Sequence, residues 1–198
     1  MNKGLSNEII FQAAAELVAE KGYDKFSLRE LASRLGVKPA SIYSHVKNAD
    51  EISTAVGMRA IAQLSAALEQ ASAVSDNDLA FLGLARAYRE FAHQNPELYR
   101  AIIGLPRTGD ETLRDNEQRT IAPLRRLAER FVHSKSEIVN FQRFLRSAMH
   151  GFISLEAAGF MRCSEVPADE SYEMLMRCCL AELKVGSLRT DTGSQRAD

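Results

Sequence analysis

Apolar residues recur at three- and four-residue intervals along almost the whole of this 198-residue chain. The first such stretch contains Ile9, Ile10, Ala13, Ala14, Leu17 and Val18. This spacing places the side chains on one face of an α-helix, because a helix turns once in about 3.6 residues. No stretch sustains the two-residue alternation of a half-buried strand. The sequence therefore predicts an all-α fold of about nine helices.

Two short predicted helices near the N-terminus form the clearest motif. The first begins at Ser27, because Ser27 and Glu30 have the spacing of a capping box, and it ends at Gly36. The second runs from Pro39, which suits a first helical position, to His45. Gly36 allows a tight turn between them. Together with the helix before them, they predict a three-helix domain containing a helix-turn-helix.

The remaining helix signals divide the chain into predicted domains. Residues 1–47 form the helix-turn-helix domain, and residues 48–185 form a larger helical domain. Within the larger domain, Asn95 is expected to cap a helix whose first residue is a proline. The last helix is expected to end near Leu183. Residues 186–198 contain few apolar side chains, so a disordered tail is expected there.

The composition is that of an ordinary globular protein, with 45% hydrophobic and 26% charged residues. No apolar run approaches the roughly 20 residues that span a bilayer, and the first residues lack a signal-peptide segment. Three cysteines, of which Cys178 and Cys179 are adjacent, cannot form a fully paired disulfide framework. We therefore expect a cytoplasmic protein whose cysteines are reduced and serve mainly as small packing residues.

Positive charge is concentrated near the N-terminus although the whole chain has a net charge of −1. Between residues 25 and 47 the only anion is Glu30, and the cations are Lys25, Arg29, Arg34, Lys38 and Lys47. An anionic partner is therefore expected at the N-terminal domain.

The second helix of the motif is expected to bury Ile42 and Val46. Its outward side then carries small or hydrogen-bonding residues, namely Lys38, Ala40, Ser41, Tyr43, Ser44 and His45. A helix with such a face can enter a DNA major groove, which is about 12 Å wide, without steric conflict.

The order of these motifs resembles the TetR family of one-component bacterial repressors over about residues 6 to 60. The matching segments are Ile9-Ile10, Ala13-Ala14, Leu17-Val18, Lys21-Gly22-Tyr23, Ser27-Leu28-Arg29-Glu30-Leu31-Ala32, Leu35-Gly36-Val37 and Ser41-Ile42-Tyr43-Ser44-His45-Val46. The resemblance implies a homodimer that binds a palindromic operator in double-stranded DNA and is released by a small-molecule effector.

By this resemblance the helix-turn-helix carries the DNA contacts. The predicted DNA-binding residues are Ser27, Arg29, Lys38, Pro39, Ala40, Ser41, Tyr43, Ser44, His45 and Lys47. Tyr43 is expected to pack on a phosphate, and Ser27 and Arg29 to meet the DNA backbone. Base edges are expected to be read by Lys38, Ala40 and Ser41. Phosphate contacts position such a domain, whereas base contacts select the sequence.

One departure from the family pattern leads to a separate hypothesis. The family commonly has a lysine in the first turn of the fourth helix, where this chain has Ala49, and Lys47 is the proposed substitute. Other roles stay open: Tyr43 could be a core residue, Lys38 or Lys47 could be merely solvated, and His45 could cap its helix.

The larger domain resembles the family's ligand-binding and dimerisation domain more weakly. Residues 91–100 are similar to the start of its sixth helix, and Met149-His150-Gly151 is similar to the signature of a Trp-His-Gly subfamily, with Met149 replacing the tryptophan. Candidate effector-binding residues are Phe81, Leu84, Tyr88, Phe91, Tyr99, Ile102, Phe141, Phe144, Leu145, Met149 and His150. Most are expected to be ordinary core, and the apolar set favours a lipophilic or aromatic ligand.

The last two long helices are the predicted dimer interface. The first carries small residues that allow close helix approach, at Ala148, Gly151, Ala157, Ala158 and Gly159. The second is expected to contribute Tyr172, Leu175, Met176, Cys179 and Leu180. A dimer would place two heads about 34 to 36 Å apart on a palindrome. The alternative is that these residues face the core of one chain.

Catalytic motifs are absent from the sequence. There is no His-Glu-x-x-His, no glycine-rich phosphate loop and no Cys-x-x-Cys, so no enzyme activity, metal or cofactor is expected. Two competing classes are an enzyme and a helical interaction protein that no longer binds DNA. Salt-dependent binding to a palindrome would favour a repressor over both, and turnover of a small molecule would favour an enzyme.

Overall fold

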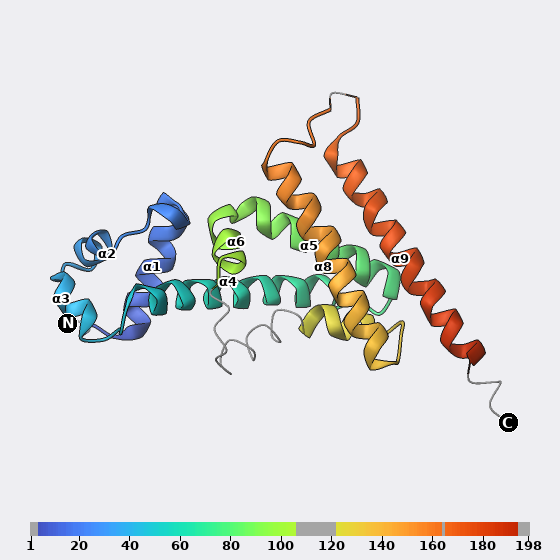
Figure 1. Cartoon of the computed structure of the whole chain (residues 1–198), viewed down its shortest axis with the longest axis horizontal. Coiled ribbons are helices and arrows are strands. Elements are labelled where there is room, and N and C mark those ends of the chain that lie inside the picture. The colour runs from blue at the N-terminus through green and yellow to red at the C-terminus, as the bar shows by residue number, and fades with distance from the viewer. Residues whose placement is uncertain (1–3, 106–121, 164, 194–198) are drawn as a thin grey trace. The chain divides into compact units, whose positions relative to one another are not determined.

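The computed structural model describes residues 4–105, 122–163 and 165–193, with side chains as far as residue 185 (Figure 1). Every regular element in these ranges is a helix, which confirms the predicted all-α class. The elements are α1 (Asn7–Lys21), the 3-10 turn η1 (Tyr23–Lys25), α2 (Leu28–Leu35), α3 (Pro39–Tyr43), α4 (Ala49–Ala71), α5 (Asn77–Gln94), α6 (Pro96–Ile103), a helical segment at residues 122–128, α8 (Lys135–Ala157) and α9 (Ala168–Gly193). Within those ranges, no helix combines the length and apolar character needed to cross a membrane.

The chain forms two compact units, and α4 and α5 each contribute residues to both. Unit 1 comprises Met1–Leu64 and Phe91–Glu117, and unit 2 comprises Ser65–Glu90 and Gln118–Asp198. This division differs from the boundary expected at residue 47, because the start of α4 and the whole of α6 belong to the same unit as α1. Helix α6 packs directly on α1.

The head of unit 1, defined as α1 to α3, has a small apolar core. Helix α1 contacts α2, and α2 contacts α3. Their inward side chains are almost completely buried, as the apolar pattern predicted, at Ile10, Val18, Leu31, Ala32, Ile42 and Val46. Burial of these residues leaves the opposite side of α3 exposed.

Local signals place the ends of α2 and α3. The Ser27 hydroxyl accepts a hydrogen bond from the Glu30 backbone N–H at 3.3 Å, which confirms the predicted cap. Gly36 adopts the left-handed conformation, with φ 67° and ψ 28°, which glycine tolerates without steric cost. Pro39 is the first residue of α3. Helix α3 ends at Tyr43, earlier than the His45 expected from sequence, and the Ser44 hydroxyl donates to the Ser41 carbonyl at 2.7 Å.

The start of α6 differs from its prediction. Asn95 occupies the N-cap position but makes no side-chain cap; its Nδ2 instead donates to the Phe91 carbonyl at 3.2 Å. Glu97 reaches out of the helix and accepts the Tyr23 backbone N–H at 2.7 Å. The Glu97 carboxylate therefore binds a donor that lies 74 residues away in the chain.

Unit 2 has a core of aromatic and aliphatic side chains from α5, α8 and α9. The fully buried members include Phe81, Leu84, Leu145, Met149 and Met176. The rings of Phe81 and Phe141 lie 6.2 Å apart between centroids, within the usual range for aromatic pairs. Helices α8 and α9 pack against each other.

The last helix is longer than the apolar pattern predicts. Helix α9 continues to Gly193, whereas its end was expected near Leu183. The stretch expected to be a tail, residues 186–198, therefore overlaps the last turns of α9, and residues 194–198 lie outside the described part.

Candidate DNA-binding and dimer surfaces

The outward face of α3 is solvent-exposed and polar. Tyr43 is 53% exposed, so it is not the core residue that was one reading of its position. The residues around it are also exposed, namely Lys38, Pro39, Ala40, Ser44 and His45, and Ser41 is half-buried. The face thus offers one aromatic hydroxyl and small side chains on a helix held from behind by Ile42.

The start of α2 contributes two further predicted contacts. Arg29 is exposed, whereas Ser27 is half-buried. The Ser27 hydroxyl donates to the Glu30 carboxylate at 3.0 Å while it accepts from the Glu30 N–H. A phosphate oxygen would therefore compete with Glu30 for this hydroxyl proton. Arg29 has no such internal partner among the described residues.

Ion pairs decide which cations of the head remain free. Arg34 makes a two-pronged contact with the Glu20 carboxylate at 2.8 and 2.6 Å, which raises the pKa of Arg34 and lowers the pKa of Glu20. Lys21 bonds Glu30 at 2.6 Å and is the main reason that the pKa of Glu30 is lowered. Within the described residues, no carboxylate pairs with the remaining cations, which are Lys25, Arg29, Lys38 and Lys47. The positive charge predicted for this segment therefore remains available to a ligand.

Lys47 lies at the junction between the head and α4. Its backbone N–H donates to the Glu51 carboxylate at 2.7 Å, and Asn48 caps α4 by accepting the Glu51 N–H at 2.9 Å. The Lys47 backbone is thereby held while its side chain is exposed. His45 is also exposed, and in the described residues its ring makes no hydrogen bond to the end of α3, so it does not cap that helix.

Two sets of long-range contacts hold the head within unit 1. Arg59 of α4 bonds Glu8 at 2.5 Å and Gln12 at 3.0 Å, both on α1. Arg100 of α6 pairs with Asp24 of η1, next to the bond between Glu97 and Tyr23. No local sequence pattern indicated these contacts, because their partners lie 47 to 76 residues apart in the chain.

The effector-binding candidates fall in both units. Phe91, Tyr99 and Ile102 are buried in unit 1. The candidates in unit 2 are buried at Phe81, Leu84, Tyr88, Phe141, Leu145 and Met149. Phe144 differs from these because it is 47% exposed. His150 is half-buried, and desolvation is the main reason that its pKa is lowered.

The predicted interface residues of α9 are mostly buried within one chain. Tyr172, Met176, Cys179 and Leu180 are each less than a tenth exposed, so they belong to the core of unit 2. For these residues the alternative reading was therefore the right one. The exposed side of α9 instead carries the small or apolar residues Met174, Cys178, Ala181 and Val185.

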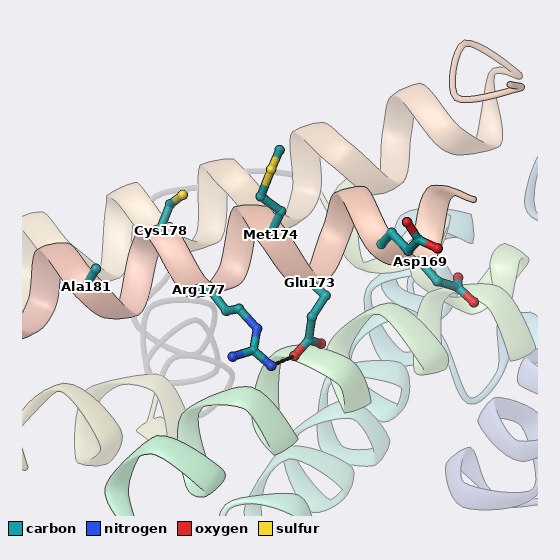
Figure 2. A pocket seen from close by; sticks show the side chains of 7 residues that line it. Asp169, Glu173, Met174, Arg177, Cys178 and Ala181 are labelled. Carbon is teal, nitrogen blue, oxygen red and sulfur yellow. Dashed lines mark hydrogen bonds and ion pairs between the residues drawn. The ribbon is translucent and has the colours of Figure 1, made fainter. Parts of the chain in front are cut away.

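A matching exposed side lies on α8. Phe144, Ser147, Gly151 and Leu155 follow one another at three- and four-residue intervals, and a side chain at Gly151 would meet open space. A groove of about 670 Å³ runs along α9 and is lined by Asp169, Glu170, Glu173, Met174, Arg177, Cys178 and Ala181. Figure 2 shows Met174 and Cys178 on one side of α9, away from the pair that Glu173 and Arg177 form at 3.2 Å. Both helices thus leave small or apolar side chains unpacked.

A charge cluster joins α5, α8 and α9 in unit 2. The Arg89 side chain is 14% exposed and bonds Glu156 at 2.9 and 2.6 Å and Asp169 at 2.7 Å. Its guanidinium also lies 5.8 Å from the centre of the Phe152 ring and 5.1 Å from that of Tyr172. Sequence reasoning missed this cluster, since an arginine in the middle of a helix resembles any solvated cation.

The cysteines divide into two kinds. Cys179 is buried, which raises the pKa of its thiol to about 11, as expected of a packing residue. Cys163 and Cys178 are exposed, so for these two the predicted packing role is wrong. In the part of the chain that the structure describes, no three His, Cys, Asp or Glu side chains converge as metal ligands would.

Comparisons with known proteins agree with this architecture. A family model described as bacterial regulatory proteins of the tetR family matches residues 10–56, and one described as the tetracyclin repressor-like C-terminal domain matches residues 81–179. A relative, the uncharacterised HTH-type transcriptional regulator Rv0681 of Mycobacterium tuberculosis, is 31% identical over 158 residues, covering 79% of this chain and 72% of the relative.

Solved structures show the same fold. The transcriptional regulator SCO7222, a TetR from Streptomyces coelicolor, has a TM-score of 0.73 at 20% identity, covering 92% of this chain and 99% of its own. A TetR variant from Acinetobacter baumannii, solved in complex with minocycline, has a TM-score of 0.67 at 19% identity. The match covers 91% of this chain and 97% of the A. baumannii chain. With family models matching both its head and its larger helical part, and with a relative aligned over most of both chains, the protein belongs to the TetR family of DNA-binding transcriptional regulators.

Proposed function

We propose that the protein is a ligand-responsive repressor that binds a palindromic operator as a homodimer and works in the cytoplasm. The observation that carries this proposal is the exposed face of α3, on which Tyr43 and Lys38 are solvent-exposed at a tip whose cations Lys25, Arg29, Lys38 and Lys47 pair with no carboxylate in the part of the chain that the structure describes. Such a tip can lie in a major groove while its cations neutralise phosphates on either side.

The roles of individual residues in this proposal follow from their exposure. Tyr43 donates its hydroxyl to a phosphate, and Arg29 and Lys47 add charged contacts to the DNA backbone. Base edges are contacted from the first turn of α3 by Lys38, Ala40 and Ser41. Ser44, His45 and Pro39 lie at the edge of the same surface, and Ser27 contributes mainly by fixing α2.

The homodimer in this proposal forms through the unpacked sides of α8 and α9. Gly151 and Ala181 allow close approach of two helix pairs, and Met174, Leu155 and Phe144 supply apolar area around them. Burial of such side chains is favourable by about 25 cal/mol for each Å² removed from water. A two-fold arrangement suits the family, because a palindrome needs two identical heads.

The effector in this proposal is an apolar or aromatic small molecule bound among the core side chains of unit 2, with Phe81, Tyr88 and Met149 as central contacts. The A. baumannii protein of the same fold was solved with minocycline, which supports a small-molecule ligand in this fold. The effector stabilises a conformation of the dimer that does not fit the operator. Linkage then requires operator and effector to weaken each other's binding by the same factor.

The test begins with a genome-wide footprint of bound sites, from which a labelled palindromic duplex is made. We expect the wild type to bind this duplex at least about a thousandfold more tightly than a scrambled duplex at physiological salt. The Lys38→Ala variant should bind more weakly, whereas Arg143→Ala, which removes an exposed cation of α8, should bind as the wild type does. Equal affinity for palindromic and scrambled duplexes would rule out operator recognition.

A further inference from the structure

The groove along α9 has an excess of negative charge near the start of the helix. The carboxylates of Glu156 and Asp169 share the single guanidinium of Arg89 there. Glu170, the next residue of α9, lines the groove, is exposed and makes no ion pair in the described part of the chain. This end of the groove therefore offers an unpaired carboxylate to a partner.

The part of the groove that follows Met174 has an excess of positive charge. Glu173 accepts a two-pronged contact from Arg86 at 3.1 and 2.8 Å, which is the main reason that the pKa of Glu173 is lowered. Arg177 adds a bond to the same carboxylate at 3.2 Å (Figure 2). Two guanidiniums thus share one carboxylate. The Arg177 side chain is 65% exposed, so its remaining donors are available to a further acceptor.

Glu170 and Arg177 lie at nearly equal distances on either side of Met174. A helix rises about 1.5 Å and turns about 100° for each residue. Glu170 is therefore about 6 Å from Met174 toward the start of α9, and Arg177 is about 4.5 Å from it toward the end. Both lie on the same edge of the exposed side, at about 40° and 60° around the helix from Met174. All three residues line the groove.

This order of charges favours an antiparallel pair of α9 helices. A two-fold axis that crosses α9 at Met174 brings Glu170 of each subunit beside Arg177 of the partner subunit, because a two-fold interface matches each contact with its mirror contact. A parallel pair would place each charge beside its own copy, where like charges repel. We infer that the homodimer pairs its α9 helices in antiparallel orientation about Met174, and that two symmetric ion pairs between Glu170 and Arg177 set this orientation.

The inference rests on the proposed homodimer and adds the orientation and register of its α9 helices. It also gives the surface a basis for choosing its partner. The apolar side chains around Met174 would accept many apolar surfaces, whereas a chain with another order of charges would bring like charges together at both edges. Such repulsion is a common source of specificity between similar interfaces.

Charge reversal tests the ion pairs. Glu170→Lys and Arg177→Glu each create two symmetric repulsions, so each should raise the dimer dissociation constant at least about tenfold in analytical ultracentrifugation. When the two variants are mixed, both cross-pairs become attractive, so native mass spectrometry should show the heterodimer in excess of either homodimer. Glu182→Lys reverses an exposed carboxylate of α9 outside the groove and should dimerise as the wild type does. Circular dichroism should show wild-type helix content in all three variants.

Disulfide formation tests the register without a change of charge. In a Cys163→Ser chain, the two Cys178 residues would lie about 12 Å apart along the helix direction, too far for a disulfide on mild oxidation. Met174→Cys in a chain that also carries Cys163→Ser and Cys178→Ser should form an inter-subunit disulfide, because the two-fold axis brings this position against its own copy. Non-reducing gel electrophoresis distinguishes the two results.

The inference is overturned if the single reversals dimerise as tightly as the wild type, if the mixed variants show no preference for each other, or if Cys178 crosslinks and position 174 does not. A monomeric wild type would overturn both the inference and the proposed homodimer. A dimer that binds the palindromic duplex but is unaffected by the charge reversals would overturn the register alone and leave the proposed repressor function standing.

Discussion

The tip of the head and the pair formed by α8 and α9 both expose one side of a helix, and the two sides differ in chemistry. Around Tyr43 the exposed residues are small, polar or cationic. On α8 and α9 the exposed residues include Leu155 at 47% and Met174 at 65% exposure. Exposure alone is common to both, so it does not reveal a partner. The chemistry of each side favours a different class of partner, because phosphates attract cations whereas apolar area favours a second apolar surface.

Local caps and distant pairs occur in both regions, and each kind of contact has a clear example. In the head, caps between residues three apart, such as Ser27 with Glu30, place the helix ends. In unit 2, Arg89 reaches Glu156 and Asp169, which are 67 and 80 residues away in the chain. The Tyr172 hydroxyl donates to the Ala85 carbonyl, which is 87 residues away. Local pairs stabilise individual helices, whereas these distant pairs determine how helices pack.

The largest effect is expected from a charge on the exposed side of α9. Met174→Glu would place two carboxylates in the proposed two-fold interface, where like charges cost several kcal/mol. We expect a monomer by light scattering and an operator affinity reduced by roughly 100-fold or more, because a single head reads half a palindrome. Met174→Leu keeps the side chain apolar and should behave as the wild type does. A Met174→Glu protein that remains dimeric would show that the apolar side of α9 does not form the dimer interface.

The next largest effect is expected on the stability of unit 2. Arg89→Met removes the guanidinium that pairs with the mostly buried Glu156 carboxylate, which should lower the free energy of unfolding by about 3 kcal/mol. Urea denaturation measures this loss. The matched control is Arg86→Met, since the Arg86 side chain is 59% exposed and its bond to Glu173 should contribute less than about 1 kcal/mol. Equal losses in the two variants would mean that the distant pairs contribute no more than surface pairs.

Tyr43→Phe tests the polar character of the exposed side of α3. Loss of a hydrogen bond to a charged phosphate should weaken operator binding by about 10-fold or more. Because the side chain is 53% exposed, the melting temperature should stay within about 1 to 2 °C of the wild type. Fluorescence anisotropy with labelled operator measures the affinity. Unchanged binding would show that the Tyr43 hydroxyl does not contact the operator.

Ser27→Ala tests how much the N-cap of α2 contributes to the stability of the head. Removal of the N-cap should lower the free energy of unfolding by about 1 kcal/mol, whereas Ser27→Thr, which keeps a capping hydroxyl, should lose much less. Thermal denaturation followed by circular dichroism gives both values. If Ser27→Ala is as stable as Ser27→Thr, the start of α2 is held by packing and not by its cap.

Lys47→Ala is expected to have the smallest effect. Each lost phosphate contact lowers the slope of log affinity against log salt by about 1, so the slope should decrease by about 1 for each head. Anisotropy titrations over about 50 to 200 mM salt determine the slope. Arg143→Ala should leave it unchanged. An unaltered slope in Lys47→Ala would show that nothing replaces the lysine missing at Ala49.

Sequence reasoning was most successful where the cause of a structure is local. The Ser27 cap, the turn at Gly36 and the burial of Ile42 depend on residues within a few positions of one another, and all three were predicted correctly. The cap expected at Asn95 is wrong, because its side-chain amide bonds the Phe91 carbonyl of the preceding helix instead of the start of α6. Propensity describes what a residue does in its own helix and carries no information about a distant competitor.

The sequence by itself determined the helical class, the helix-turn-helix and the chemistry of the α3 tip, because helical periodicity and capping are properties of neighbouring residues. Only the tertiary structure decided which side of α9 is core and which is exposed. Met176 and Met174 are the same residue type two positions apart, yet Met176 is buried and Met174 is exposed. It alone placed Arg89 against Glu156. Those outcomes depend on the packing of helices far apart in the chain, which no short pattern of residues encodes.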